Sequence, residues 1–143
     1  MKVLFDTCVW SLSLRRSRKS VAMAPDEILL LKTLSEAIKD GRVAIIGPIR
    51  QELLSGIRDG AQFKKLSTAL DAFPDETLTT PYYVEAARLF NLCRSHGVEC
   101  GPVDMVICAT AVLKKWPIVT NDAGLSRCIT VLRSEGLISA TAP

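Results

Sequence analysis

Four acidic residues stand where an expected strand ends or an expected helix begins. Two of them directly follow short apolar runs that are typical of buried strands, and the other two lie within the first turns of helices that Gly-Pro pairs open. Strand ends and the starts of the following helices share one edge of a parallel α/β sheet, so all four carboxylates can face one cleft there. The four residues are Asp6, Glu52, Asp104 and Asp122.

Carboxylates gathered in this way, without histidine or cysteine among them, are ligands for hard divalent cations. The predicted cofactor is therefore Mg²⁺, with Mn²⁺ as an alternative, held by Asp6, Asp104 and Asp122. One or two such ions can activate water and stabilise the leaving oxygen of a phosphodiester, so all four acids, Glu52 included, are predicted catalytic residues. Without the ion, mutual repulsion predicts raised and coupled pKa values among them.

Asp104 is the most unusual of the four, since it lies in a segment, 103–113, that is apolar almost all round. A charged group there costs free energy unless it is paired or binds a metal, although the positive end of the helix dipole offsets part of that cost. Asp6 has a simpler interpretation, because an aspartate after a strand is a common helix cap. Capping is the better interpretation of Asp6 taken alone, whereas several carboxylates converging on one edge would favour a site.

Neighbouring polar residues can support this cleft. Thr7 can add a hydroxyl to metal or water, and Thr120 or Asn121 can orient Asp122, while ordinary capping and turn roles are equally compatible with all three. A second group of residues forms a short basic stretch, and its members are Arg15, Arg16, Arg18 and Lys19. This stretch is either a set of RNA contacts that bind phosphates or a solvated loop, and the sequence does not decide between the two.

The elements that must position these residues alternate along the chain. Short runs of β-forming residues predict strands at 3–5, 42–46, 77–79 and 118–120, with an edge strand at 137–139. Helical patterns predict helices at 8–14, 25–40, 48–57, 61–73, 81–95, 102–115 and 124–133. This alternation predicts a single domain over 1–143 of the α/β class, with a central, mostly parallel four- to five-stranded sheet and helices on both faces.

Composition argues against several other classes. The chain has 143 residues, which suits one hydrophobic core, and 48% of them are hydrophobic, which argues against disorder. No apolar run is long enough to span a bilayer, and the order of charged and apolar residues near the N-terminus is wrong for a secretory signal, so we expect a cytoplasmic protein with no membrane partner. The net charge of +3 permits a polyanionic partner without demanding one.

The five cysteines are odd in number and show no C-x-x-C spacing. This pattern indicates neither a disulfide framework nor a zinc knuckle. We therefore expect reduced thiols that are buried as small apolar side chains.

Four blocks of sequence, taken in order, carry a resemblance to a known family. The blocks are Val-Leu-Phe-Asp6-Thr7, Arg50-Gln-Glu52-Leu-Leu-Ser-Gly56, Val103-Asp104-Met-Val-Ile-Cys-Ala-Thr-Ala111 and Val119-Thr-Asn-Asp122. Together they resemble the PIN-domain nucleases, and most of all the VapC-type toxins of toxin–antitoxin modules, over essentially the whole chain. The resemblance implies a PIN-like fold, Mg²⁺- or Mn²⁺-dependent endoribonuclease activity on RNA, frequent homodimers, and a cognate antitoxin protein whose tail occupies the cleft.

The chain departs from the family pattern at one point. Many relatives follow the last block with a further acid and then phenylalanine, whereas here Gly124 and Leu125 take those places. The predicted cluster is therefore one acid short, which weakens the expectation of a second metal more than that of the first.

Other functions stay open beside the toxin nuclease. They are a PIN nuclease that matures RNA or acts on DNA, and a non-catalytic RNA-binding or scaffold domain. A phosphotransfer domain with Asp6 as its nucleophile fits less well, because no acid stands two residues further on and no well-placed lysine is evident.

Overall fold

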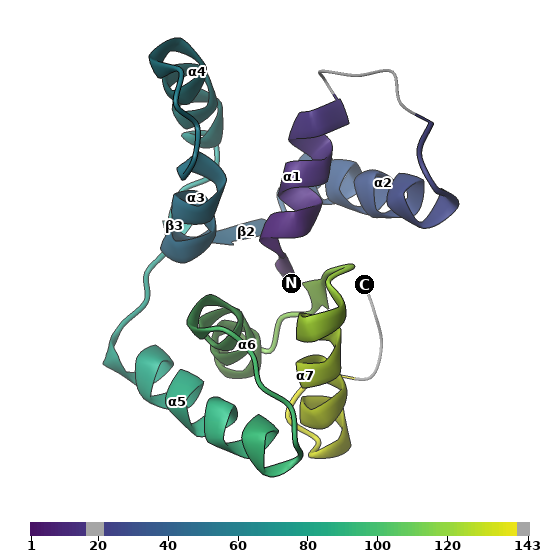
Figure 1. The fold of residues 1–143 in the computed structure, drawn as a ribbon, viewed down its shortest axis with the longest axis vertical. Coiled ribbons are helices and arrows are strands. Elements are labelled where there is room, and N and C mark those ends of the chain that lie inside the picture. The colour runs from purple at the N-terminus through teal and green to yellow at the C-terminus, as the bar shows by residue number, and fades with distance from the viewer. Residues whose placement is uncertain (17–21, 140–143) are drawn as a thin grey trace.

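The protein is built around a sheet whose strands all run parallel to their neighbours (Figure 1). A computed structural model describes residues 1–16 and 22–139, and this part of the chain contains a four-stranded sheet with the order β3-β2-β1-β4. The strands are β1 (Val3–Phe5), β2 (Val43–Ile46), β3 (Asp75–Glu76) and β4 (Ile118–Val119). The structure confirms the predicted α/β class, and its four strands lie within the predicted four to five.

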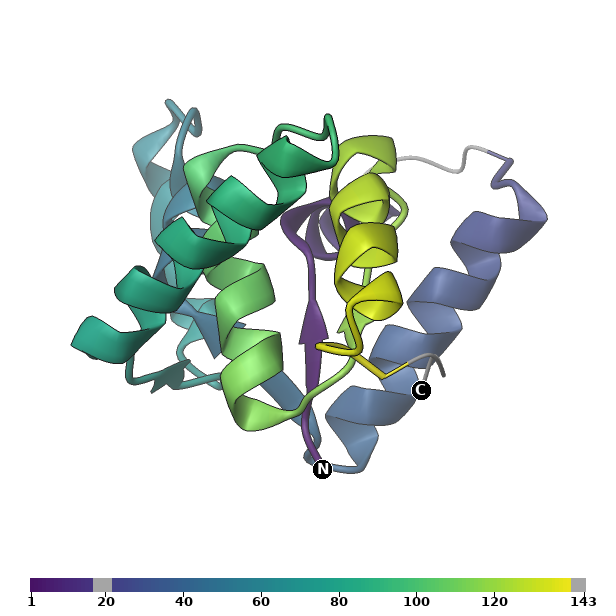
Figure 2. The same cartoon turned by 90° about the horizontal axis from the view of Figure 1, so that it is seen from below.

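The described residues also form seven helices. They are α1 (Thr7–Arg16), α2 (Pro25–Lys39), α3 (Gly47–Leu54), α4 (Gly60–Leu70), α5 (Thr80–Ser95), α6 (Pro102–Lys114) and α7 (Ala123–Ser134). Helices α5, α6 and α7 lie on one face, and α1, α2 and α3 lie on the other (Figures 1 and 2). Within residues 1–16 and 22–139, none of the helices combines the length and the apolar character needed to cross a membrane.

Strand β1 is the centre of the sheet and fixes its functional edge. Leu4 is in register with Ala44 of β2 on one side and with Ile118 of β4 on the other. Because these strands are parallel, their carboxyl ends meet at a single edge. Figure 2 shows β1 pointing to the upper edge of the view, where α1 and α7 begin.

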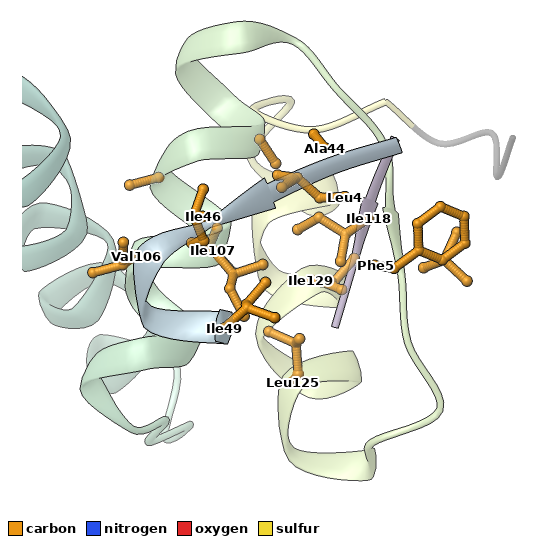
Figure 3. Packing of buried hydrophobic residues seen from close by; sticks show 14 of the residues in the cluster. Leu4, Phe5, Ala44, Ile46, Ile49, Val106, Ile107, Ile118, Leu125 and Ile129 are labelled. Carbon is orange, nitrogen blue, oxygen red and sulfur yellow. The ribbon is translucent and has the colours of Figure 1, made fainter. Parts of the chain in front are cut away.

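The hydrophobic core packs against both faces of β1. Leu4 and Phe5 are fully buried, and Figure 3 shows them among Ile107 of α6 and Leu125 of α7. Burying each such side chain stabilises the fold by about 1.5–3 kcal/mol, so β1 and the residue that follows it are held firmly. Helix α6 is buried continuously from Met105 to Ala111, as the apolar pattern of this segment predicts.

Two strand predictions are wrong. The third strand is β3, which pairs Asp75 and Glu76 with the end of β2, and the predicted segment 77–79 lies after it. Residues 137–139 form no strand among the described residues. The β propensity of segment 77–79 was a poor guide, because the chain is already held against β2 before it reaches Thr77.

An arginine is responsible for that early contact. Nε of Arg50, in α3, is 3.0 Å from Oδ1 of Asp75, and Nη1 donates to the carbonyl of Leu70 at 3.1 Å. Its Nη2 also donates to the carbonyl of Phe73. The guanidinium thus clamps the chain between α4 and β3 onto α3, the helix that carries Glu52.

Replacing this clamp should destabilise the fold. We expect Arg50→Met to lower the free energy of unfolding in urea by about 1–2 kcal/mol, because two carbonyls and a carboxylate lose a charged donor. Arg88→Met is the matched control, since Arg88 forms an exposed ion pair with Glu85 one helical turn away and should change stability by less than about 0.5 kcal/mol. Equal losses in the two variants would contradict a clamping role.

The cysteine prediction is only partly right. Cys93 and Cys108 are buried free thiols, and Cys8 is a half-buried one, but Cys100 and Cys128 form a disulfide. The bond joins the segment before α6 to α7. Their separation of 28 residues gave no sign of this pairing, which depends on how the two helices pack.

Candidate active site

Asp6 lies between β1 and α1, and its side chain is only 6% exposed. Its Oδ1 accepts the backbone N–H of Thr7 at 2.7 Å, and its Oδ2 accepts the hydroxyl of Thr120 at 2.8 Å. The thiol of Cys8 also donates to Oδ2, at 3.3 Å. These donors compensate the cost of burying a carboxyl group and fix its orientation.

Thr120 joins Asp6 to Asp122. While its hydroxyl donates to Asp6, its Oγ1 accepts the backbone N–H of Asp122 at 3.0 Å. Asp122 is the N-cap of α7, and its Oδ2 accepts the backbone N–H of Leu125 at 2.8 Å. Asn121, between the two, is exposed. Thr120 therefore sets the position of two carboxylates at once.

Thr7 provides the link to the third carboxylate. Its hydroxyl donates to Oε1 of Glu52 at 2.6 Å, which connects the start of α1 to α3. Glu52 is otherwise exposed, so this hydrogen bond is what directs it toward the edge of the sheet where Asp6 lies.

Asp104 lies in the first turn of α6 and is half-buried. Burial, followed by repulsion from Asp6, Asp122 and Glu52, raises the pKa of Asp104 from its usual 3.8 to about 6. Charges separated by much more than a Debye length would not act on it appreciably. The four acids therefore lie near one another at the carboxyl edge of the sheet, and we call Asp6, Glu52, Asp104 and Asp122 the carboxylate quartet.

The donor chemistry of the quartet suits a hard divalent cation. Its ligands are all carboxylate oxygens, and their mutual repulsion is relieved by positive charge. Across residues 1–16 and 22–139, however, no three acid, histidine or cysteine side chains converge closely enough to hold an ion by themselves. Mg²⁺ does not require such a group, since it usually keeps several waters and binds through one or two carboxylates together with substrate phosphates.

Some residues near the quartet differ from the sequence expectations. Cys8 was not predicted to belong to the cleft, although it directly follows Asp6 and Thr7 and burial raises the pKa of its thiol. Among the predicted RNA contacts, Arg15 and Arg16 end α1, whereas Arg18 and Lys19 lie outside the described residues.

Gly124 has a structural consequence for Asp122. A Cβ atom at position 124 would lie 3.2 Å from Oδ2 of Asp122 and 3.9 Å from Nη2 of Arg127. A side chain there would therefore crowd the capping carboxylate. In this chain the position of the further acid thus lies close to both a carboxylate and a guanidinium.

These features define a class of protein: α/β domains with a parallel sheet whose carboxyl edge carries a group of acids. The family model for the PIN domain matches residues 3–128. The chain therefore belongs to the PIN-domain family.

Solved structures share the fold. One is FitAcB from Neisseria gonorrhoeae, with a TM-score of 0.68 and 20% identity over 89% of this chain and 93% of that one. Another is VapBC2 from Rickettsia felis bound to a DNA fragment from their promoter, with a TM-score of 0.66 and 18% identity over 85% of this chain and 88% of that one. No curated protein matches the sequence.

The double hydrogen bond of Thr120 leads to a prediction. Thr120→Val should weaken Mn²⁺ binding in calorimetry by about tenfold, because Asp6 and Asp122 lose the hydroxyl that orients them. Thr120→Ser should bind almost like the wild type. Thr130→Val is the control, since its hydroxyl bonds only to a carbonyl of its own helix. Equal affinities in all four proteins would show that Thr120 does not orient the quartet.

Proposed function

We propose that this protein is a metal-dependent endoribonuclease that acts as the toxin of a toxin–antitoxin pair. PIN domains are generally nucleases, and the chain belongs to that family. The observation that supports the proposal is that Thr7 and Thr120 link Asp6, Glu52 and Asp122 through hydrogen bonds. These three acids also lie near enough to Asp104 for their repulsion to contribute to its raised pKa. Acids gathered in this way are suited to a divalent ion and a phosphodiester.

Each member of the quartet has a proposed role. Asp6, Asp104 and Asp122 would hold Mg²⁺ or Mn²⁺, in part through waters that the ion keeps, and the bound ion would supply charge stabilisation and activate water. Glu52 is exposed and held only through Thr7, so it is the carboxylate that can orient the attacking water and take up its proton. Cleavage of the phosphodiester then requires that the substrate strand enter a cleft of like charge.

The proposed partners follow from the resemblance to VapC-type toxins. They are an RNA substrate, a cognate antitoxin whose tail fills the cleft, and a second copy of the chain. The structural similarity to FitAcB and VapBC2 supports the toxin assignment through the fold alone. A PIN nuclease of RNA maturation would use the same cleft without an antitoxin.

The test uses the purified protein without a partner. Cleavage of total cellular RNA should require added Mg²⁺ or Mn²⁺ and stop with a chelator. Expression should arrest growth, and a small open reading frame beside the gene should restore it. Cleavage without growth arrest or rescue would favour a nuclease of RNA maturation. If the protein neither cleaves RNA nor binds metal, the non-catalytic domain is the better interpretation.

A further inference from the structure

Arg127 stands out among the arginines as an unpartnered cation beside the quartet. It is exposed on α7, five residues after Asp122, and within the described ranges its side chain forms no hydrogen bond or ion pair. Most other described arginines are occupied. Arg42, Arg50, Arg88 and Arg94 are in ion pairs, and Arg133 donates to a carbonyl.

The guanidinium of Arg127 and the carboxylate of Asp122 both lie close to Gly124. A Cβ on that glycine would lie 3.2 Å from Oδ2 of Asp122 and 3.9 Å from Nη2 of Arg127. The two charged groups nevertheless do not approach within the distance of an ion pair, so the positive charge of Arg127 is not neutralised by Asp122.

An RNA strand entering this cleft needs positive charge at the rim. Its phosphates meet four carboxylates, and a divalent ion compensates only those next to it. Guanidinium is the protein group whose planar fork matches phosphate oxygens, and it keeps its charge at any physiological pH. An unpaired arginine next to the acids can therefore attract the strand without removing a carboxylate from the metal.

We propose that Arg127 is a substrate-binding residue, which contacts a phosphate of the RNA strand from its exposed position on α7 near Asp122. The inference rests on the proposed function and adds a residue that the basic stretch at 15–19 did not indicate. A single arginine in an amphipathic helix gives no clustered signal in the sequence, and only the packing of α7 places it at the rim.

The test compares Arg127→Ala with Arg127→Lys and with Arg88→Ala, which removes an arginine of the same charge from α5. Binding of a short unstructured RNA is measured in an Asp6→Asn background, so that the strand stays intact, and cleavage kinetics are measured without that change. Thermal melting of each variant checks that the fold is retained.

We expect Arg127→Ala to raise the Kd for RNA and the KM by about tenfold, with kcat changed by less than about twofold. The slope of log affinity against log salt should fall by about 0.7, the value for one phosphate contact on a single strand. Arg127→Lys should keep the salt slope of the unsubstituted protein and recover part of the RNA affinity. Arg88→Ala should have the same affinity and salt slope as the protein with Arg88.

Two results would overturn the inference. One is Arg127→Ala binding RNA like Arg88→Ala with an unchanged salt slope, and the other is a loss confined to kcat. Failure of the proposed function can be told apart from failure of this inference. In that case the wild-type protein would cleave no RNA with any metal, whereas the salt slopes would still report whether Arg127 binds a phosphate.

Discussion

Asp6→Asn should slow RNA cleavage by about a hundredfold or more at saturating Mn²⁺. Asp6 is the most buried member of the quartet, and three donors hold its carboxylate. The amide removes one negative charge from the metal site. It also turns an NH₂ group toward either the N–H of Thr7 or the hydroxyl of Thr120, where an acceptor is needed.

The measurement is the initial rate of cleavage of a defined RNA over a range of Mn²⁺ concentrations. Asp71→Asn provides the control, because Asp71 is exposed at the end of α4 and does not belong to the quartet. Asp104→Asn should lose activity to a similar extent as Asp6→Asn. If both quartet variants cleave RNA at the wild-type rate, the quartet is not the catalytic centre.

Acidification should have opposite effects on the metal-free fold and on metal binding. The pKa of Asp104 in the folded protein, about 6, lies above its usual 3.8, so the folded state binds this proton more tightly than the unfolded state. The contribution of Asp104 to stability is therefore greatest at low pH and is lost as pH rises through about 6. Because Asp104 is partly solvated, we expect this contribution to fall by about 1 kcal/mol or less between pH 5 and pH 7.

Metal binding should follow pH in the other direction. A bound ion must displace the proton of Asp104, so the affinity for Mn²⁺ should weaken by about tenfold from pH 7 to pH 5. Urea unfolding with a chelator and calorimetry with Mn²⁺ measure the two trends. Asp104→Asn should remove the part of both pH dependences, that of unfolding and that of Mn²⁺ affinity, which comes from this residue. It should also make the metal-free protein more stable than the wild type at pH 7. The repulsion would be contradicted if the free energy of unfolding of the wild type, compared with that of Asp104→Asn, increased from pH 5 to pH 7.

The sequence was a good guide to the elements with strong local signals. Glycine and proline mark the starts of α3 and α6, and the apolar segment from Met105 to Ala111 is buried as expected. Strand β3 was misplaced because its position depends on Arg50, whose partners lie 20 or more residues away in the sequence. Long-range contacts of this kind leave no local pattern.

The sequence was less informative about how the site is held. Four acids could be chosen because each stands at a strand end or in the first turns of a helix. Which hydroxyl bonds which carboxylate depends on side-chain rotamers and on the packing of α1, α3 and α7. Thus the sequence does not indicate that the hydroxyl of Thr7 donates to Glu52 or that the guanidinium of Arg127 lies close to Gly124.

The bond between Cys100 and Cys128 has a consequence for proteolysis. It closes a covalent ring that contains α6, β4, Thr120 and two quartet members, Asp104 and Asp122. A protease that cuts the backbone once inside this ring leaves both fragments attached through sulfur. The nicked protein should migrate at full mass on a non-reducing gel and separate into two bands only after a thiol reductant is added.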